Sequence, residues 1–246
     1  YPPKSLASPP FKAGGFGEKL RVRGLTDTAA GRPTAALADE ILLPGEGQVK
    51  ALICIGGNPM AAWPDQRKTQ QAMEQLELLV TLDVEMSTTA RVADYVIACK
   101  QTLETPGMSQ SGEAIKYFGS GIGFPGAYAQ YSPAVADVPH GSDLLEDWEF
   151  FYSMANHLDL DLVFASAFGF SRYQEAPYEI MPLSRTRKPD IDALYSSICA
   201  HSRIAMDEVK QYPHGHVFDS NVFVQPRDAG WDDRLDCGDD VMMQQL

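Results

Sequence analysis

A glycine-rich turn is the first place in this sequence where backbone and side chains could bind a ligand. The apolar run at residues 49–55 is followed by Gly56, Gly57, Asn58 and Pro59. Glycine lets a backbone approach a ligand without a Cβ clash, and an asparagine amide both donates and accepts hydrogen bonds. The turn lacks the third glycine of a dinucleotide fingerprint and the Lys-Ser/Thr pair of a triphosphate loop. Two interpretations stay open, a ligand-binding crevice and a tight turn.

Two carboxylates could bind the hydrogen-bond donors of a nucleoside. Asp83 directly follows Leu82 near the end of a second apolar run, residues 78–84. A carboxylate at the end of a parallel strand can accept from a ribose diol, or from the N1–H and amino groups of guanine. A turn or capping role explains Asp83 equally well. Asp147 lies near the start of an expected helix at 143–158, where a solvated acid is the ordinary alternative.

The remaining metal-binding and nucleophilic residue types do not predict a site. His214 and His216 could share a metal on a strand, but no third ligand is near in sequence and Pro213 and Gly215 favour a turn. No Gly-x-Ser-x-Gly elbow marks a nucleophile. The cysteines form no Cys-x-x-Cys pair, which argues against a zinc ribbon or a ferredoxin-type cluster. They lie far apart, at Cys54, Cys99, Cys199 and Cys237. We therefore expect neither a catalytic nucleophile nor a metal ligand within this sequence.

The elements that must position the turn and the carboxylates indicate an α/β fold. Short, nearly all-apolar runs are typical of strands buried on both faces in a parallel sheet. We expect such strands at 49–55, 78–84 and 94–98. A helix at 65–77, with Asp65 as its N-cap, would connect the first two in a right-handed βαβ unit. Ligands bind at the carboxyl ends of such strands, which is where both candidate motifs lie.

Outside this unit the sequence predicts shorter elements. Residues 117–131 alternate glycine with aromatic residues and could line a substrate passage or form a covering loop. A strand pair and an acidic tail are expected from Val217 onward. We expect further helices at 35–43, 143–158 (with Ser142 as N-cap), 191–200 and 206–212, and one helical turn at 87–92.

Composition narrows the function classes. The 246 residues carry a net charge of −13, and an acidic surface repels phosphate backbones, so nucleic-acid binding is not expected. The sequence contains no run of eighteen apolar residues, so no transmembrane helix is expected. Scattered thiols favour a reducing compartment, so a cytoplasmic location is expected, with the periplasm as the alternative. Because the first residue is Tyr1 and no signal-peptide pattern follows, we expect a processed product or a fragment of a larger protein.

Three stretches of the sequence match the pattern of one enzyme family. They are Ala-Leu-Ile-Cys-Ile-Gly-Gly-Asn-Pro at 51–59, Leu-Val-Thr-Leu-Asp at 79–83 and Thr-Thr-Ala-Arg-Val-Ala-Asp-Tyr-Val at 88–96. Asp147 and Trp148 match the Asp-Trp at the start of a later family helix. The sequence thus resembles the molybdopterin guanine dinucleotide oxidoreductases, the family of dimethyl sulfoxide reductase, formate dehydrogenase and periplasmic nitrate reductase.

The resemblance extends over residues 35–246, is specific over 49–96, and includes departures. The family's Glu-Lys-x-Gly segment is Glu-Thr-Pro-Gly at 104–107, so a lysine that contacts the cofactor in some members is missing. The family's cysteine cluster and metal ligand have no counterpart here. By resemblance, 1–45 is an extended lead-in, 46–165 a Rossmann-like guanosine-binding domain, and 166–246 a segment leading toward a missing C-terminal domain.

The resemblance also implies a function. The chain would be the central cofactor-binding part of a molybdenum or tungsten oxidoreductase that performs two-electron redox or oxygen-atom chemistry, with a four-iron–four-sulfur cluster in the missing N-terminal part. Its partners would be the rest of the same catalytic subunit and an electron-transfer subunit, and the isolated segment would be inactive. The alternative is a non-catalytic nucleotide-binding or interaction module without the metal half. The residues implied to bind the guanosine end, with Asp83 foremost for guanine, are Gly56, Gly57, Asn58, Leu82, Asp83 and Asp147.

Overall fold

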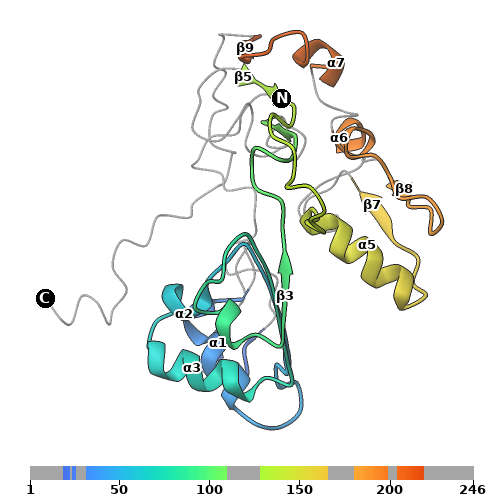
Figure 1. The fold of residues 1–246 in the computed structure, drawn as a ribbon. Coiled ribbons are helices and arrows are strands. Elements are labelled where there is room, and N and C mark those ends of the chain that lie inside the picture. Colours follow the sequence, from blue (N-terminus) through green and yellow to red (C-terminus); the bar gives the residue numbers. More distant parts are fainter. Residues whose placement is uncertain are drawn as a thin grey trace, which may run out of the picture.

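A three-stranded parallel sheet forms the centre of the N-terminal half of the computed structural model (Figure 1). Its strands are β1 (Ala51–Ile55), β2 (Leu78–Asp83) and β3 (Tyr95–Ala98), in the order β1-β2-β3. The expected parallel sheet is therefore confirmed, and each strand end lies within two residues of its expected position. The structure describes residues 19–22, 24–25, 32–109, 128–165, 180–198 and 204–218.

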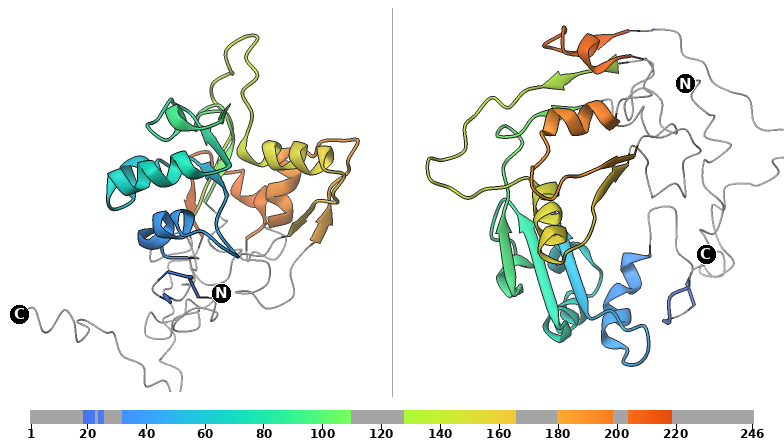
Figure 2. Two further views of the ribbon diagram at one scale, coloured as in Figure 1. Left: turned by 90° about the horizontal axis from the view of Figure 1, so that it is seen from below. Right: turned by 90° about the vertical axis from the view of Figure 1, so that its right-hand side faces the viewer.

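Helices cover both faces of this sheet, as Figure 2 shows. On one face, α3 (Gln66–Gln75) packs its buried Met73 against Cys54 and Leu79. On the other face, α5 (Asp147–His157) places Phe150 and Phe151 against a cluster that includes Leu82. Neighbouring residues of β2 therefore point to opposite layers, which explains why this central strand is almost wholly apolar.

The helices on the β1 side begin and end where local chemistry requires. Asp65 caps α3, because its carboxylate accepts a hydrogen bond from the backbone N–H of Lys68 at 3.1 Å. The short α2 (Pro59–Ala62), which the sequence did not predict, starts with a proline at its first position. A 3₁₀ turn, η1 (Thr34–Ala36), leads into α1 (Leu37–Leu42), in the range where a helix was expected.

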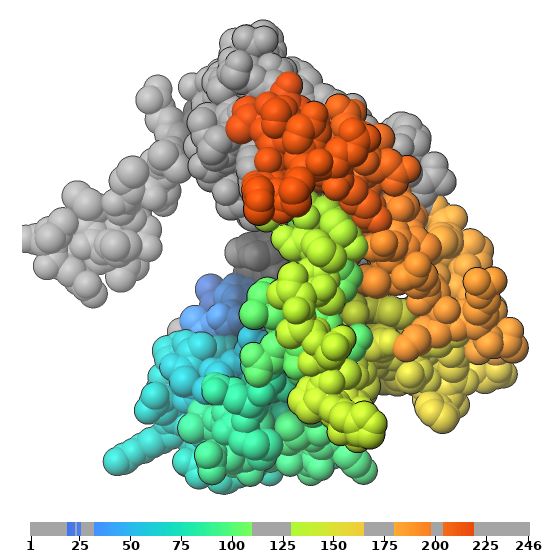
Figure 3. Space-filling model, turned by 45° about the horizontal axis from the view of Figure 1, so that its top comes forward, coloured from blue at the N-terminus to red at the C-terminus, as the bar shows by residue number. Residues whose placement is uncertain are grey.

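The second half of the chain consists of short helices and two-stranded pairs. Tyr195 of α6 donates a hydrogen bond to the backbone oxygen of Pro106 at 2.7 Å and so ties this half to the segment after β3. In Figure 3 the last described segment, coloured orange-red, lies against the yellow-green residues that follow Tyr128. The remaining elements of the described residues, from both halves, are η2 (Ala90–Val92), β4 (Gly107–Met108), β5 (Tyr128–Ala129), β6 (Tyr131–Ser132), β7 (Val163–Ala165), β8 (Ile180–Pro182), α6 (Ile191–Ile198), α7 (Met206–Val209) and β9 (His216–Val217).

One predicted helix start was wrong. The helix expected at 143–158 begins at Asp147, and its N-cap is Glu146 rather than Ser142. Glu146 and Glu149 form a reciprocal capping box, in which each side chain accepts from the other residue's backbone N–H. The helix therefore starts where two glutamates can accept hydrogen bonds from backbone N–H groups at its N-terminus, four residues after Ser142.

Other expectations have mixed outcomes. The helix expected at 206–212 is shorter, since α7 ends at Val209. The glycine-aromatic segment as far as residue 127, and the tail from residue 219, lie outside the described residues, and the domain boundaries stay predictions. None of the helices in the described ranges is both long and apolar enough to cross a membrane.

Candidate functional site

The glycine-rich turn closes the carboxyl end of β1 against β2. The Gly56 backbone adopts a φ of 55°, a left-handed conformation that favours glycine, and its N–H donates to the Leu82 oxygen at 2.9 Å. The side chain of Leu82 is only 1 % exposed and packs toward α5. Leu82, one of the predicted site residues, therefore contacts the turn through its backbone oxygen, while its side chain belongs to the core.

Asn58 joins the turn to the segment after β2. Its Oδ1 accepts hydrogen bonds from the Thr88 hydroxyl at 2.8 Å, the Thr89 hydroxyl at 2.8 Å and the Thr89 N–H at 3.2 Å. Its Nδ2 makes no hydrogen bond to any residue in the described ranges. The amide oxygen thus has a structural role, and the donor nitrogen is the part of Asn58 that could bind a ligand.

Asp83 ends β2 and is also a turn residue. Its Oδ1 accepts from the backbone N–H of Val84 at 2.8 Å and of Glu85 at 3.3 Å, and its backbone oxygen accepts from Cys99 N–H at 3.1 Å. The side chain is half-buried. The turn role that the sequence left open is therefore observed, while Oδ2 has no hydrogen bond within the described part of the chain.

Asp147 lies beside the end of β3 although it belongs to α5. Cys99, which follows β3, forms a β-bridge with Leu145, two residues before Asp147, and its thiol lies 3.6 Å from the Ile97 backbone oxygen. Burial, the hydrogen bond to Asp147 and the negative charges of Asp147 and Asp83 raise the pKa of Cys99 to about 12. Burial and the charge of Asp83 likewise raise the pKa of Cys54 to about 11. Asp83 at the end of β2 and Asp147 at the start of α5 therefore lie on either side of Cys99, whose backbone contacts Asp83 and Leu145.

A cavity of about 340 Å³ opens next to Asp147. Lys100 and Thr105 come from the segment after β3, and aromatic and aliphatic side chains from α5, β7 and α6 form much of the rest of the wall. Asp83 and Asn58 are not among the lining residues, so they belong to the neighbouring strand edge. The cavity is lined by Lys100, Thr105, Glu146, Asp147, Trp148, Phe164, Ile191, Leu194 and Tyr195.

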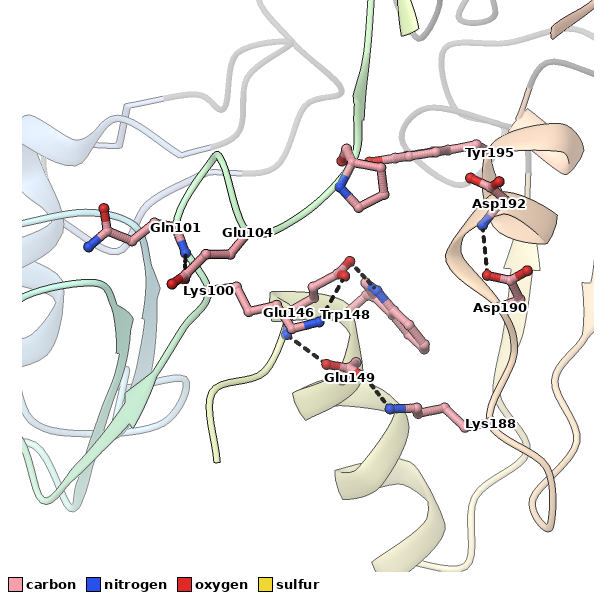
Figure 4. A network of polar contacts seen from close by, with 11 residues as sticks. Lys100, Gln101, Glu104, Glu146, Trp148, Glu149, Lys188, Asp190, Asp192 and Tyr195 are labelled. Carbon is pink, nitrogen blue, oxygen red and sulfur yellow. Dashed lines mark hydrogen bonds and ion pairs between the residues drawn. The ribbon is translucent and has the colours of Figure 1, made fainter. Parts of the chain in front are cut away.

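Paired charges hold the start of α5 against this cavity (Figure 4). One oxygen of Glu146 lies 3.3 Å from Lys100 Nζ, and the other accepts from Trp148 Nε1 at 2.9 Å. Glu149 pairs with Lys188. Burial opposes ionisation of Glu149, but the Lys188 hydrogen bond, the Glu146 N–H and the lysine charges hold its pKa below the ordinary value.

Sequence reasoning missed Lys100 and Glu146. The Glu-x-x-Glu spacing of residues 146 and 149 is a local capping signal that could have placed the helix start. Lys100 has no such signal, because its partners are 45 or more positions away in sequence.

His214 lies in a turn, and His216 begins the short strand β9. Gly215 has a φ of 76°, and its N–H donates to the Tyr212 oxygen at 2.9 Å. The His216 ring stacks on the ring of Tyr212 with centroids 4.1 Å apart. No group of three or more His, Cys, Asp or Glu side chains suited to a metal ion occurs among the residues with described positions.

Residues 21–117 match the family model described as Molybdopterin oxidoreductase. The chain is similar to this family over these residues. The matched residues include the glycine-rich turn, Asp83, Lys100 and Thr105, whereas Asp147 lies beyond the match. The resemblance expected from the sequence is therefore confirmed over residues 21–117.

Curated proteins are similar to parts of this chain. The chain is 29 % identical over 86 residues to "Probable oxidoreductase YyaE" of Bacillus subtilis, covering 35 % of this chain and 13 % of that protein. It is 32 % identical over 92 residues to the "F420-dependent formate dehydrogenase 1 subunit alpha" of Methanococcus maripaludis, covering 37 % and 14 %. Against the "NADPH-Fe(3+) oxidoreductase subunit alpha" of Geobacter sulfurreducens it is 26 % identical over 113 residues, covering 46 % and 12 %.

A solved structure, "Acetylene Hydratase from Pelobacter acetylenicus", aligns with 52 % of this chain and 16 % of its own, at 23 % identity and a TM-score of 0.42. The aligned part of this chain spans between 12 % and 14 % of the length of the curated relatives.

Proposed function

We propose that this chain is the central cofactor-binding segment of a molybdenum or tungsten oxidoreductase and that it binds the guanosine end of molybdopterin guanine dinucleotide. The observation that carries this proposal is the place of two carboxylates: Asp83 ends β2, and Asp147 begins α5 beside the end of the neighbouring strand β3. Both residues thus lie at the carboxyl edge of a parallel sheet, in a chain that is similar to the molybdopterin oxidoreductase family model. That edge is where open α/β sheets bind nucleotides.

The cavity beside this edge suits a purine base. It has a volume of about 340 Å³ and flat aromatic side chains, Trp148 and Tyr195, in its wall. Asp147 supplies a carboxylate that can accept from the N1–H and the amino group of guanine together. Glu146 and Asp147 would repel a phosphate, so the base rather than the diphosphate would enter this cavity.

We assign Asp147 to the guanine edge and Asp83 to the ribose hydroxyls. Asp147 lines the cavity, whereas Asp83 does not and already uses Oδ1 for two backbone N–H groups. The sequence had favoured Asp83, rather than Asp147, as the residue that binds guanine. Gly56 and Gly57 would let the backbone approach the nucleotide, and Asn58 would donate from Nδ2.

The proposal also extends beyond these residues. The bound cofactor would supply a molybdenum or tungsten centre for two-electron redox or oxygen-atom chemistry. This chain would bind and orient the nucleotide end, and the metal ligand and an iron–sulfur cluster would come from the rest of the same catalytic subunit. An electron-transfer subunit would complete the enzyme, and the isolated chain would have no turnover.

Calorimetric titration of the 246-residue chain with GDP and ADP tests the proposal, because GDP carries the guanosine diphosphate part of the cofactor. GDP should bind at least about tenfold more tightly than ADP, and Asp147→Asn should remove that preference. Asp207→Asn is the matched control, since Asp207 is also a first-turn acid but belongs to α7. Equal binding of GDP and ADP, or no binding of either, would contradict the proposal.

A further inference from the structure

Lys100 is the one cation among the described residues that line the cavity. Its backbone N–H donates to the Leu145 oxygen at 2.9 Å, which fixes the residue beside the start of α5. Its Nζ lies 3.3 Å from Glu146 Oε1. An ammonium group has three N–H donors, and one hydrogen bond to a residue in the described ranges accounts for only one of them.

Glu146 holds this ammonium group in a defined place. The glutamate is itself fixed by the Trp148 indole at 2.9 Å and by the backbone of the capping box. The Lys100 and Glu146 side chains are 24 % and 13 % exposed, so the pair is largely shielded from water. Figure 4 shows Lys100 reaching Glu146 at the N-terminus of α5, with Tyr195 coming from α6. Lys100 thus has a fixed direction and unused donors in the wall that contains Asp147.

We infer that Lys100 determines base specificity in this cavity by donating a hydrogen bond to the carbonyl O6 of guanine, and this inference rests on the proposed function. Guanine presents the O6 acceptor directly beside the N1–H and amino donors. A lysine next to an aspartate matches this order of acceptor and donors. Adenine presents an amino group where guanine has O6 and an acceptor at N1, so Lys100 would meet a donor and Asp147 an acceptor.

The two carboxylates in the cavity wall favour a base over a phosphate as the ligand of Lys100. A phosphate bound to Lys100 would also face the carboxylates of Glu146 and Asp147, at a cost in repulsion. A guanine carbonyl carries only a partial negative charge, and its ring presents donors to Asp147 at the same time. The aromatic side chains of Trp148 and Tyr195 would contact the faces of the ring.

The lysine pairs of α5 provide a matched control. Lys100 pairs with Glu146 and Lys188 pairs with Glu149, but only Lys100 lines the cavity. Lys100→Met and Lys188→Met therefore each leave one α5 glutamate without its lysine. Thermal unfolding of both variants measures this common structural effect.

Titration of the 246-residue chain with GDP, 6-thio-GDP and ADP tests the role of O6. Sulfur is a weaker acceptor than oxygen, and 6-thio-GDP keeps N1–H and the amino group. The wild-type chain should bind GDP more tightly than 6-thio-GDP. Lys100→Met should weaken GDP binding about tenfold to a hundredfold and bring the two ligands to similar affinity. Lys188→Met should leave the ratio of the two affinities unchanged.

An unchanged GDP affinity in Lys100→Met, or an unchanged ratio of GDP to 6-thio-GDP affinity, would overturn the inference while leaving the proposed function intact. Lys100→Arg keeps a cation beside Glu146 and should retain part of the ratio, which preserves the test if the methionine variant does not fold. No preference of the wild-type chain for GDP over ADP would instead contradict the proposed function itself.

Discussion

Thr89 donates two hydrogen bonds to the same atom of Asn58, one from its backbone N–H and one from its hydroxyl. Thr89 is fully buried, and its hydroxyl also accepts from the Met60 N–H at 3.0 Å. Asn58, which the sequence predicted to contact a ligand, therefore also connects β1, α2 and the segment after β2 through Thr89. The ligand contact that we propose for Asn58 and the local stability of this turn therefore involve the same side chain.

Asn58→Ala should lower the free energy of unfolding by about 1–3 kcal/mol, because it removes the acceptor of a buried donor group. Asn58→Asp keeps an acceptor oxygen at the same place and should lose less. Urea unfolding of the ligand-free chain measures both values. Equal stability of Asn58→Ala and the wild type would mean that these hydrogen bonds contribute nothing.

The start of α3 gives a second prediction. Asp65 caps the helix and has a φ of 56°, a left-handed conformation that asparagine and aspartate tolerate better than alanine. Asp65→Ala loses the cap and keeps the unfavourable backbone, so it should lower stability by about 1–2 kcal/mol. Asp65→Asn retains both features and should stay within about 0.5 kcal/mol of the wild type. A loss in the asparagine variant as large as in the alanine variant would contradict this account.

The buried thiols should be unreactive and should make the fold sensitive to alkali. Burial, followed by the interactions with Asp147 and Asp83, raises the pKa of Cys99 from an ordinary 9.0 to about 12. The unfolded thiol ionises near the lower value and the folded thiol near the higher one. This part of the stability is therefore present below pH 9.0 and is lost as the pH rises toward about 12.

Iodoacetamide labelling with peptide mapping checks the thiol prediction. Cys99 of the folded chain should label far more slowly at pH 8 than it does in urea. Asp147→Asn removes one of the negative charges and should speed labelling of Cys99 more than that of Cys54, whose pKa is raised by burial and Asp83. Equal acceleration at both cysteines would show that the variant only loosens the fold.

The Glu149–Lys188 pair predicts a loss of stability in acid. The pKa of Glu149 is held below its ordinary value of 4.5 in spite of burial, because Lys188 and the Glu146 N–H bind the charged form. Stability from this pair is present above pH 4.5 and is lost as the pH falls below it. Lys188→Met should flatten the pH dependence of unfolding in that range. If the free energy of unfolding of Lys188→Met fell with decreasing pH as steeply as that of the wild type, other carboxylates would be responsible for the loss of stability.

The sheet was predictable because its information is local. Each strand is a short apolar run, and the buried positions of β2 alternate between the α3 side and the α5 side, which only a strand covered on both faces requires. Asp65 was likewise predictable, since a cap acts within three residues of its own position.

The cavity was not predictable, because the residues that line it come from distant parts of the sequence. Lys100 meets Glu146 across a separation of 46 positions, and Tyr195 meets Pro106 across 89. Ser142 is an ordinary capping residue, yet the reciprocal bonds of Glu146 and Glu149 fix the helix start further on. The sequence placed Asp83 and Asp147 as candidates, but their common position at the carboxyl edge of the sheet depends on how α5 packs against it.

The central claim is that these residues hold the guanosine end of a molybdopterin cofactor. The most direct measurement is acid release of nucleotide and metal from the protein that carries this chain, purified from its own host. The protein should release GMP together with molybdenum or tungsten, and Asp147→Asn should lower the amounts of both by about an order of magnitude. Release of AMP, or of metal without any guanine nucleotide, would contradict it.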